Sequence, residues 1–204
     1  APPDAPGARA ALAEAAAGRP LWLAASTHPG EEAIVGEAHR RAAARVPGLL
    51  TLLAPRHPER GPEIAADLLA RGLAVTRRAA GESPRAETDL HLLDTLGEMG
   101  AWLRLAPVCL LGGSLVAGIG GHNPHEPVAL GCALLRGPHV ENFAADFAAL
   151  GAAAPTVADA PELAAAVVRL LGDAPARRAA AEAAARALPD GRAARAATVE
   201  ALLA

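Results

Sequence analysis

Short runs of apolar residues alternate along the chain with longer stretches in which apolar residues recur every three or four positions. The short runs have the length of buried strands, and the longer stretches have the spacing of helices that pack on a sheet. The predicted strands cover residues 21–25, 49–53, 73–76, 90–93, 108–111, 133–135 and 155–157. The predicted helices cover residues 31–46, 62–71, 97–105 and 123–130, and three alanine-rich helical stretches follow from Pro161, separated at residues 172–173 and 189–191.

Strands this short and apolar, separated by helices, predict an α/β fold with a doubly wound, mostly parallel sheet of the Rossmann-like type. Helices cover both faces of such a sheet, because the crossovers between parallel strands are right-handed. Ligands bind beyond the carboxyl ends of the strands. The segments that follow each strand are therefore the place to look for function.

Polar and glycine-rich residues gather in four of these segments. They read STHPGEE at 26–32, PRHPER at 55–60, DTLGE at 94–98 and GGSLVAGIGGHNPHEP at 112–127. Each follows a predicted strand, so all four are expected to converge on one edge of the sheet.

Composition narrows the classes of function. A content of 52% hydrophobic and 20% charged residues is typical of a folded globular protein, and the net charge of -3 provides no basic footprint for nucleic acid. The most apolar stretch, residues 105–119, is broken by proline and glycine and falls short of the roughly 20 apolar residues of a membrane helix. Cys109 and Cys132 lie in apolar runs, which favours small core residues in a reducing compartment over a disulfide framework. The opening APPDAPG has the composition of a linker and not of a signal peptide.

The glycine-rich segment after residue 111 has features of an anion site. Its paired glycines allow the backbone to approach a ligand closely, and Asn123 is a suitable N-cap for a helix whose free N–H groups attract an anion. A plain glycine turn explains the glycines equally well. Glu126, in the first helical turn, either caps that turn or accepts hydrogen bonds from sugar hydroxyls. The segment matches neither a Walker loop nor a GxGxxG motif.

Other polar residues at this edge also have two interpretations. Arg56 follows Pro55, and its guanidinium is able to donate two hydrogen bonds to a phosphate. An isolated arginine in a loop, however, is usually a solvated surface charge. Ser26 and Thr27 fit hydrogen-bond donors in a loop that enters a helix. A nucleophile pair of Ser26 and His28 is disfavoured, because no nucleophile elbow surrounds it.

A metal site is not expected from the sequence. His122 and His125 are three positions apart rather than the four of a helical zinc motif, and Pro124 and Pro127 shorten any helix here. The sequence contains no HExxH motif, no cysteine pair with metal-ligand spacing and no DxD-like acidic pair.

Taken together, STHPGEE, PRHPER, DTLGEM, GGSL…GGHNPHEP and GPHVENF follow one another here in an order that resembles the carboxyl-terminal half of the 3-deoxy-D-manno-octulosonic acid (Kdo) transferases of lipopolysaccharide synthesis. The resemblance covers residues 21–143, and the ordered set is specific although each piece alone is not. It implies a GT-B glycosyltransferase, in which two Rossmann-like domains face each other across a cleft. In this family the carboxyl-terminal domain holds the donor, CMP-Kdo. The amino-terminal domain holds the lipid A precursor and the catalytic glutamate, and usually carries the membrane anchor.

The resemblance assigns ligand contacts to particular residues. The family's CMP contacts fall on Pro55, Arg56, Leu96, Gly97, Glu98, Asn123, Pro124, His125 and Glu126. Further candidates for contact with the donor are Ser26, Thr27, Gly113, Ser114 and Gly121. By this resemblance, Arg56 and the amides at helix starts would hold the phosphate or nucleotide, and Glu126 the ribose. Two positions depart from the family: His125 stands where leucine is usual, and an aromatic residue often lies near Leu105.

The resemblance also divides the chain and limits its activity. Residues 1–19 are expected to form an interdomain linker and first helix, and residues 20–204 a nucleotide-sugar-binding domain. No residue here corresponds to the catalytic glutamate, so the chain is expected to bind CMP or CMP-Kdo without transferring sugar, and no metal or other cofactor is implied. Association with the cytoplasmic face of the bacterial inner membrane would come through the other half. Two alternatives stay open: another GT-B enzyme, acting on a UDP-sugar as transferase or epimerase, and a non-catalytic nucleotide-binding module.

Overall fold

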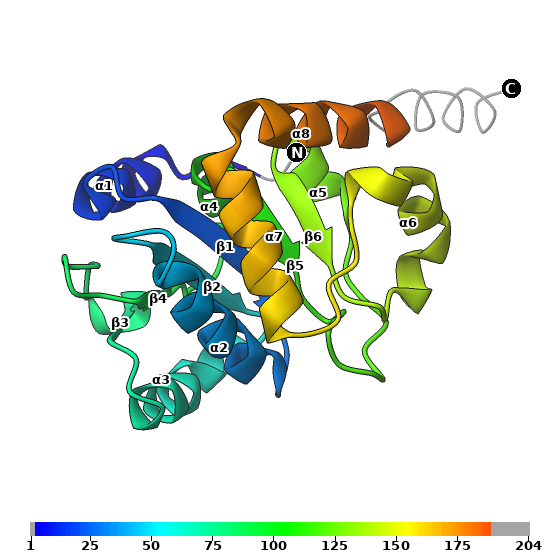
Figure 1. Cartoon of the computed structure of the whole chain (residues 1–204). Coiled ribbons are helices and arrows are strands. Elements are labelled where there is room, and N and C mark those ends of the chain that lie inside the picture. Colours follow the sequence, from blue (N-terminus) through cyan, green and yellow to red (C-terminus); the bar gives the residue numbers. More distant parts are fainter. Residues whose placement is uncertain (1–2, 189–204) are drawn as a thin grey trace, which may run out of the picture.

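The computed structural model describes residues 3–188 and contains one six-stranded sheet between two layers of helices (Figure 1). Its strands are β1 (Leu21–Thr27), β2 (Leu50–Pro55), β3 (Val75–Arg77), β4 (Leu90–Leu92), β5 (Val108–Leu111) and β6 (Ala133–Arg136). They lie in the order β3-β4-β2-β1-β5-β6, and every neighbouring pair is parallel. The predicted α/β fold with a doubly wound parallel sheet is confirmed.

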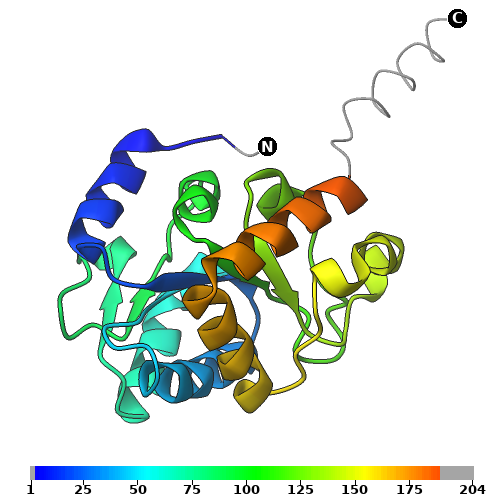
Figure 2. The same ribbon diagram turned by 45° about the horizontal axis from the view of Figure 1, so that its top comes forward.

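The helices divide between the two faces of the sheet, as Figure 2 shows. One face is covered by α2 (Glu31–Ala43), α3 (Gly61–Ala70) and α7 (Ala160–Gly172). The other is covered by α1 (Pro6–Ala16), α4 (Met99–Leu105), α5 (His125–Ala129), α6 (Ala144–Leu150) and α8 (Ala174–Ala187). Four short 3-10 helices complete the chain: η1 (Pro58–Arg60), η2 (Arg78–Ala80), η3 (Glu141–Phe143) and η4 (Gly151–Ala153).

The central strand β1 explains why both layers are needed. Its side chains alternate between the faces, as a period of two requires. Trp22 and Ala24 pack with the first layer, and Leu21, Leu23 and Ala25 pack with the second, all of them buried. A strand that carries apolar side chains on both faces of the sheet is stable only when helices exclude water from both faces.

The region expected to be linker and first helix contributes to this core. Helix α1 begins at Pro6, a residue suited to the first turn because its missing N–H has no partner there. Leu12 and Ala16 are buried in the second layer, and Pro3 lies against Gly100 of α4. Residues 3–19 therefore pack onto the second layer of helices and belong to the same core.

At the carboxyl-terminal side the structure differs from the sequence-based expectations at one strand and one helix. The predicted strand at 155–157 forms only an isolated parallel bridge between Thr156 and Arg136, because the chain turns at once into α7, which Asp159 caps by accepting the amide of Glu162. Helix α6 was not predicted, since residues 144–150 have neither a capping side chain nor a clear apolar period. The third alanine-rich stretch lies outside the described residues. Within residues 3–188, no helix combines the length and the hydropathy needed to cross a bilayer.

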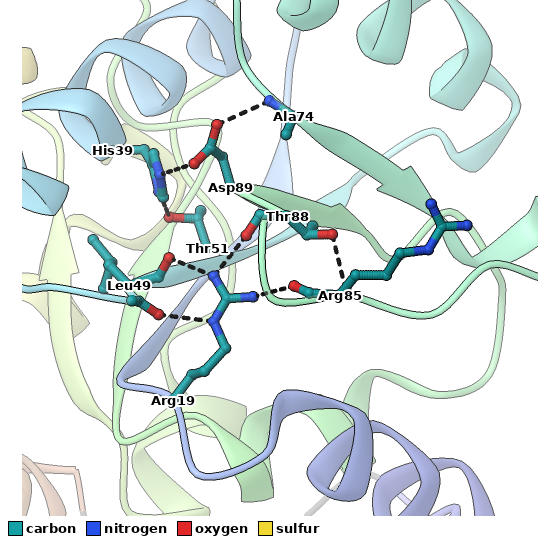
Figure 3. A network of polar contacts seen from close by, with 9 residues as sticks. Arg19, His39, Leu49, Thr51, Ala74, Arg85, Thr88 and Asp89 are labelled. Carbon is teal, nitrogen blue, oxygen red and sulfur yellow. Dashed lines mark hydrogen bonds and ion pairs between the residues drawn. The ribbon is translucent and has the colours of Figure 1, made fainter.

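A polar network joins the amino ends of three adjacent strands, at the edge opposite the predicted site (Figure 3). The Arg19 guanidinium donates to four backbone carbonyls: those of Gly48 at 2.8 Å, Leu49 at 2.9 Å, Arg85 at 2.6 Å and Thr88 at 2.6 Å. Arg19 precedes β1, residues 48–49 precede β2 and residues 85–88 precede β4. We call this set of contacts the Arg19 clasp.

Beside the clasp, a buried imidazole links the same loops to the sheet. His39 of α2 bonds Thr51 of β2 through Nδ1 at 2.9 Å and Asp89 through Nε2 at 3.3 Å. Asp89 in turn accepts the amide of Ala74 at 2.9 Å. Burial is the main reason that the pKa of His39 is lowered, so this ring is neutral and contributes hydrogen bonds rather than charge.

Candidate functional site

The order of the strands places a crevice at the carboxyl ends of β1 and β5. The chain proceeds from β1 to β2 on one side of it, and β5 continues to β6 on the other side. Such a point, where the winding reverses, is where α/β sheets bind ligands. The segments after β1, β2, β4 and β5 meet here, as the sequence predicts.

Two clefts open at this edge and share two residues. The Arg56 cleft is lined by Ser26, Ala54, Pro55, Arg56, Pro58, Leu93, Thr95, Leu96, Gly97, Met99 and Trp102. The Glu126 cleft is lined by Ala25, Ser26, Met99, Leu103, Leu111, His122, Asn123, Glu126 and Pro127. Ser26 and Met99 belong to both, so the two clefts are neighbours and one elongated ligand is able to span them.

Seven of the residues predicted as ligand contacts line these clefts: Ser26, Pro55, Arg56, Leu96, Gly97, Asn123 and Glu126. The other seven line neither of the two: Thr27, Glu98, Gly113, Ser114, Gly121, Pro124 and His125. The contacts of this second group show what each residue does instead.

Ser26 has an unusual backbone at the meeting point of the clefts. Its φ of 57° lies in the left-handed region, which costs energy in a residue with a side chain, and the register of β1 with β2 shifts between Ala25 and Thr27. Gly112 packs directly on this turn, and a Cβ at Gly112 would lie 2.6 Å from the Ser26 carbonyl oxygen. The irregularity lies near the carboxyl end of β1, and Ser26 lines both clefts.

Arg56 supplies a positive charge that the protein leaves uncommitted. Its amide donates to the Thr27 carbonyl at 2.9 Å, which fixes the backbone, while its side chain is exposed. Within the described residues, no carboxylate pairs with its guanidinium. An arginine held in this way is available to an anionic group.

Glu98, by contrast, is committed to partners in the protein. Its carboxylate accepts bonds from Arg78 at 2.6 and 2.5 Å and from the Thr95 hydroxyl at 2.5 Å. The hydrogen bond from Arg78 is the main reason that the pKa of Glu98 is lowered. Arg78 also stacks on Trp102 at 5.0 Å. Glu98 therefore holds the turn that presents Leu96, whose side chain is 81% exposed at the rim of the Arg56 cleft.

Glu31, at the start of α2, is a structural residue that the sequence reasoning missed. It is fully buried, and its two oxygens accept the amides of His28 at 2.9 Å, Gly113 at 2.7 Å, Ser114 at 2.9 Å and Leu115 at 2.8 Å. The anion that the glycine-rich loop encloses is thus a side chain of the protein itself. No local signal in the sequence reveals this contact, because Glu31 and the loop amides are more than 80 positions apart.

This arrangement changes the interpretation of two candidates. The amides of Gly113 and Ser114 are used by Glu31 and are not free for a ligand. The Ser114 hydroxyl is buried as well; it donates to the Leu111 carbonyl at 2.6 Å and accepts the amide of Gly137 at 2.8 Å. Ser114 is therefore part of the scaffold, and the expected contact with the donor has no polar atom to make it.

Thr27 has a similar internal role. Its buried hydroxyl donates to Glu32 at 3.2 Å, and Glu32 also pairs with Arg60 at 2.9 Å. Glu32 is the last residue of the STHPGEE segment and Arg60 the last residue of the PRHPER segment, so their ion pair joins the two segments. The expectation that the Thr27 hydroxyl faces a ligand is corrected, because Glu32 already uses it.

The far end of the glycine-rich loop is closed by contacts from GPHVENF. Gly121, with φ of 79°, donates its amide to Gly113 at 2.7 Å. Asn142 donates its side-chain amide to the Ile119 carbonyl at 2.8 Å and its backbone amide to Gly120 at 2.9 Å. Gly121 therefore shapes the loop, and the GPHVENF segment braces it.

The HNPHE segment delivers Asn123 and Glu126 to their cleft. The N-cap of helix α5 is Pro124, whereas the sequence predicted Asn123. The Asn123 side chain accepts a hydrogen bond from the amide of His125 at 2.9 Å. The His125 ring lies against Asp146 of α6, with Nε2 at 3.2 Å from the carboxylate. No group of three or more His, Cys, Asp or Glu side chains within residues 3–188 is arranged to hold a metal.

Comparisons with known proteins bear on this site. No protein-family model matches the chain. It is 44% identical over 126 residues to the 3-deoxy-D-manno-octulosonic acid transferase of Haemophilus influenzae, covering 61% of this chain and 29% of that protein. It is 45% identical over 184 residues to the transferase of the same name from Bordetella pertussis, covering 84% and 41%. The chain thus spans less than half the length of these curated relatives.

Solved structures extend the likeness over nearly the whole fold. The C-terminal CMP-Kdo binding domain of WaaA from Acinetobacter baumannii matches with a TM-score of 0.81 and 30% identity, over 90% of this chain and 97% of that domain. A trehalose-phosphate synthase from Burkholderia vietnamiensis, with a TM-score of 0.60 and 18% identity, shares the fold alone. Because the WaaA domain is matched almost from end to end, the chain belongs to the 3-deoxy-D-manno-octulosonic acid transferase family, as its ordered motifs indicate.

Proposed function

We propose that this chain binds CMP-Kdo and is the donor-binding part of an enzyme that transfers Kdo to a lipid A precursor. One observation carries the proposal: two clefts that meet at Ser26 and Met99 bring together a free arginine, an exposed leucine and an exposed carboxylate. The names of the relatives, Kdo transferases and a CMP-Kdo binding domain, support the choice of nucleotide.

In the proposed complex the nucleotide spans both clefts. Glu126 accepts hydrogen bonds from the ribose hydroxyls in one cleft. Arg56 forks onto the phosphate in the other, and Leu96 with the Gly97 backbone covers the nucleotide. During transfer the phosphate departs with CMP, so Arg56 stabilises the negative charge that grows on the leaving group.

The remaining parts of the reaction are proposed from the family. A carboxylate in the amino-terminal domain deprotonates the acceptor hydroxyl, which attacks the anomeric carbon as CMP leaves, without a metal. The chain by itself then binds the donor but transfers nothing. The complete protein works at the cytoplasmic face of the inner membrane, where the lipid acceptor is anchored.

Calorimetric titration of the chain with CMP and UMP tests the proposal. CMP is expected to bind more tightly than UMP, and Arg56→Ala is expected to weaken CMP binding by about 1.5–3 kcal/mol, the range for a hydrogen bond to a charged group. Arg45→Ala is the matched control, because Arg45 is exposed at the opposite edge, between α2 and β2. Tighter binding of UMP would favour a UDP-sugar enzyme. An unchanged affinity in Arg56→Ala would return Arg56 to an ordinary surface charge.

A further inference from the structure

Three imidazoles lie in a row beside the two clefts, at the carboxyl edge of the sheet. Nε2 of His28 is 2.8 Å from Nε2 of His122, and the two ring planes differ by 19° with centroids 5.0 Å apart, so the rings meet edge to edge. The ring of His57 stands edge-on to His28 at 5.9 Å. At one end of the row His122 lines the Glu126 cleft beside Asn123, and at the other end His57 follows Arg56 in the chain.

The short distance between the two Nε2 atoms limits the charge of the His28–His122 pair. A hydrogen bond forms only when one nitrogen carries a proton and the other offers its lone pair. Both rings can be neutral in this arrangement, or one can be an imidazolium. A second added proton would bring two N–H groups face to face and break the bond. The pair therefore holds either no positive charge or one.

The charges around the pair determine which of these states is occupied. Burial is the main reason that the pKa of each ring is lowered, and the positive charge of Arg56 acts in the same direction on both. His57 also lowers the pKa of His28. Glu31 opposes these effects at both rings, but its carboxylate is already engaged by four amides, and Glu32 opposes them at His28. The unliganded pair is consequently neutral near pH 7.

Room for this contact is built into the glycine-rich loop. A Cβ at Gly113 would lie 3.0 Å from the His122 ring, and the φ of 67° at Gly113 also disfavours any side chain there. The glycine thus allows His122 to approach His28. Within residues 3–188, the Nδ1 atoms of both rings make no hydrogen bond to the protein, so a proton can be added to the pair without loss of an existing contact.

We propose that the His28–His122 pair takes up one proton when the phosphodiester of the donor binds, and that the resulting imidazolium, together with Arg56, neutralises that anion. The inference rests on the proposed function, because a nucleotide with its ribose at Glu126 and its phosphate at Arg56 passes His122, which lines the Glu126 cleft. A phosphate anion bound beside the pair raises the pKa of the rings, and so opposes the effects of burial and Arg56 that keep the pair neutral. Binding is then coupled to protonation, and affinity rises as the pH falls.

The test requires a ligand that does not titrate itself. Cytidine 5′-methyl phosphate is such a probe: like the donor it is a phosphodiester, and it lacks the second ionisation near pH 6 of a phosphate monoester. Calorimetry at pH 7 in buffers of different ionisation enthalpy measures the number of protons taken up. We expect about 0.5 proton at pH 7, and an affinity about 5- to 20-fold higher at pH 6 than at pH 8, within the limit of tenfold per pH unit for one proton.

Variants assign the proton to the pair. Glutamine keeps a hydrogen-bonding group but does not titrate, so the double variant His28→Gln/His122→Gln, in which no ring of the pair remains, is expected to bind the probe without the proton uptake that the pair supplies. His139→Gln is the control, since His139 is partly exposed and lines neither cleft. It is expected to keep the proton uptake of the wild-type chain.

Nuclear magnetic resonance titration of the histidine rings gives a second, independent readout in the unmodified chain. The pKa of His28 or His122 should rise by at least about one unit when the probe is bound, equivalent to a tenfold change in affinity. Binding of the probe with no proton uptake and no change in these pKa values would overturn the inference and leave the proposed function intact. Absence of binding at every pH would overturn both.

Discussion

At the scale of single residues, the site combines a charge that the protein buries with one that it leaves free. Glu31 is inaccessible to solvent and is surrounded by four amides, while Arg56 stands exposed a short distance away. A buried carboxylate is tolerated only when its oxygens are fully hydrogen-bonded. The burial of Glu31 therefore shapes the loop, and the exposure of Arg56 leaves it available for a ligand.

Replacing Glu31 tests this division. In Glu31→Gln, one carboxylate oxygen becomes an NH2 group that faces two N–H donors, so two buried hydrogen bonds to a charged group are lost. The free energy of unfolding, measured by urea titration, should fall by about 3 kcal/mol or more. Glu37→Gln, at a solvent-screened ion pair on the same helix, is the control and should leave the free energy of unfolding almost unchanged. Equal losses in the two variants would show that Glu31 does not organise the loop.

The sequence predicted which residues gather at the site better than it predicted their roles. Arg56, Leu96, Gly97, Asn123 and Glu126 all line the two clefts. Local spacing cannot reveal that the amides of the glycine-rich loop are already occupied, because the acceptor lies more than 80 positions away in the chain. The same limit applies to Glu98, whose partner Arg78 lies 20 positions away in the chain.

At the scale of elements, the two edges of the sheet have different tasks. The carboxyl ends of the strands carry exposed polar side chains and glycine turns, whereas the amino ends are joined by the Arg19 clasp. The strands were predictable because runs of buried apolar residues bounded by glycine and proline are a strong local signal. The clasp and α6 were not, since one depends on backbone carbonyls from distant loops and the other on packing against the second layer.

The clasp makes a prediction about stability that is independent of ligand binding. Arg19→Lys replaces a forked group that reaches four carbonyls with one ammonium that cannot reach all of them. The free energy of unfolding should fall by about 2–3 kcal/mol, allowing for the partial exposure of these contacts. Arg71→Lys, at an exposed pair with Asp67, provides the comparison and should have little effect.

The affinity of Arg19→Lys for CMP should stay within about twofold of the wild-type value, because mutations at distant sites act independently. A large loss of CMP binding in this variant would contradict the separation of the two edges. A free energy of unfolding equal to that of the wild-type chain would contradict the structural role of the clasp.

At the scale of the whole molecule, two imidazoles inside the sheet region make stability depend on pH. His91 of β4 is buried and bonds the Thr76 hydroxyl through Nδ1 at 2.9 Å. Burial is the main reason that its pKa falls to about 4, and Arg78 adds to the effect. The pKa of His39 is lowered for the same main reason. Below pH 6.5 these two imidazoles therefore bind protons in the unfolded chain but stay neutral in the folded chain, until the pH falls to their lowered pKa.

The sign of this effect gives a testable pH window. The contribution of neutral His91 to stability is fully present above about pH 6.5 and is lost as the pH falls to about 4, a decrease of roughly 3 kcal/mol in the free energy of unfolding. His91→Asn keeps a group near Nδ1 for Thr76 but does not titrate. Urea unfolding of both chains from pH 7.5 to 4 should show a shallower decline for the variant, and identical declines would contradict the assignment.

The central claim is that loops from four strands hold one cytidine nucleotide across the two clefts at the carboxyl edge of the sheet. The most direct test is a crystal structure of the chain with bound CMP. We predict that the phosphate lies within hydrogen-bond distance of the Arg56 guanidinium and that the ribose hydroxyls contact Glu126. A nucleotide bound at the opposite edge, near the Arg19 clasp, or turned so that its phosphate avoids Arg56, would contradict the account.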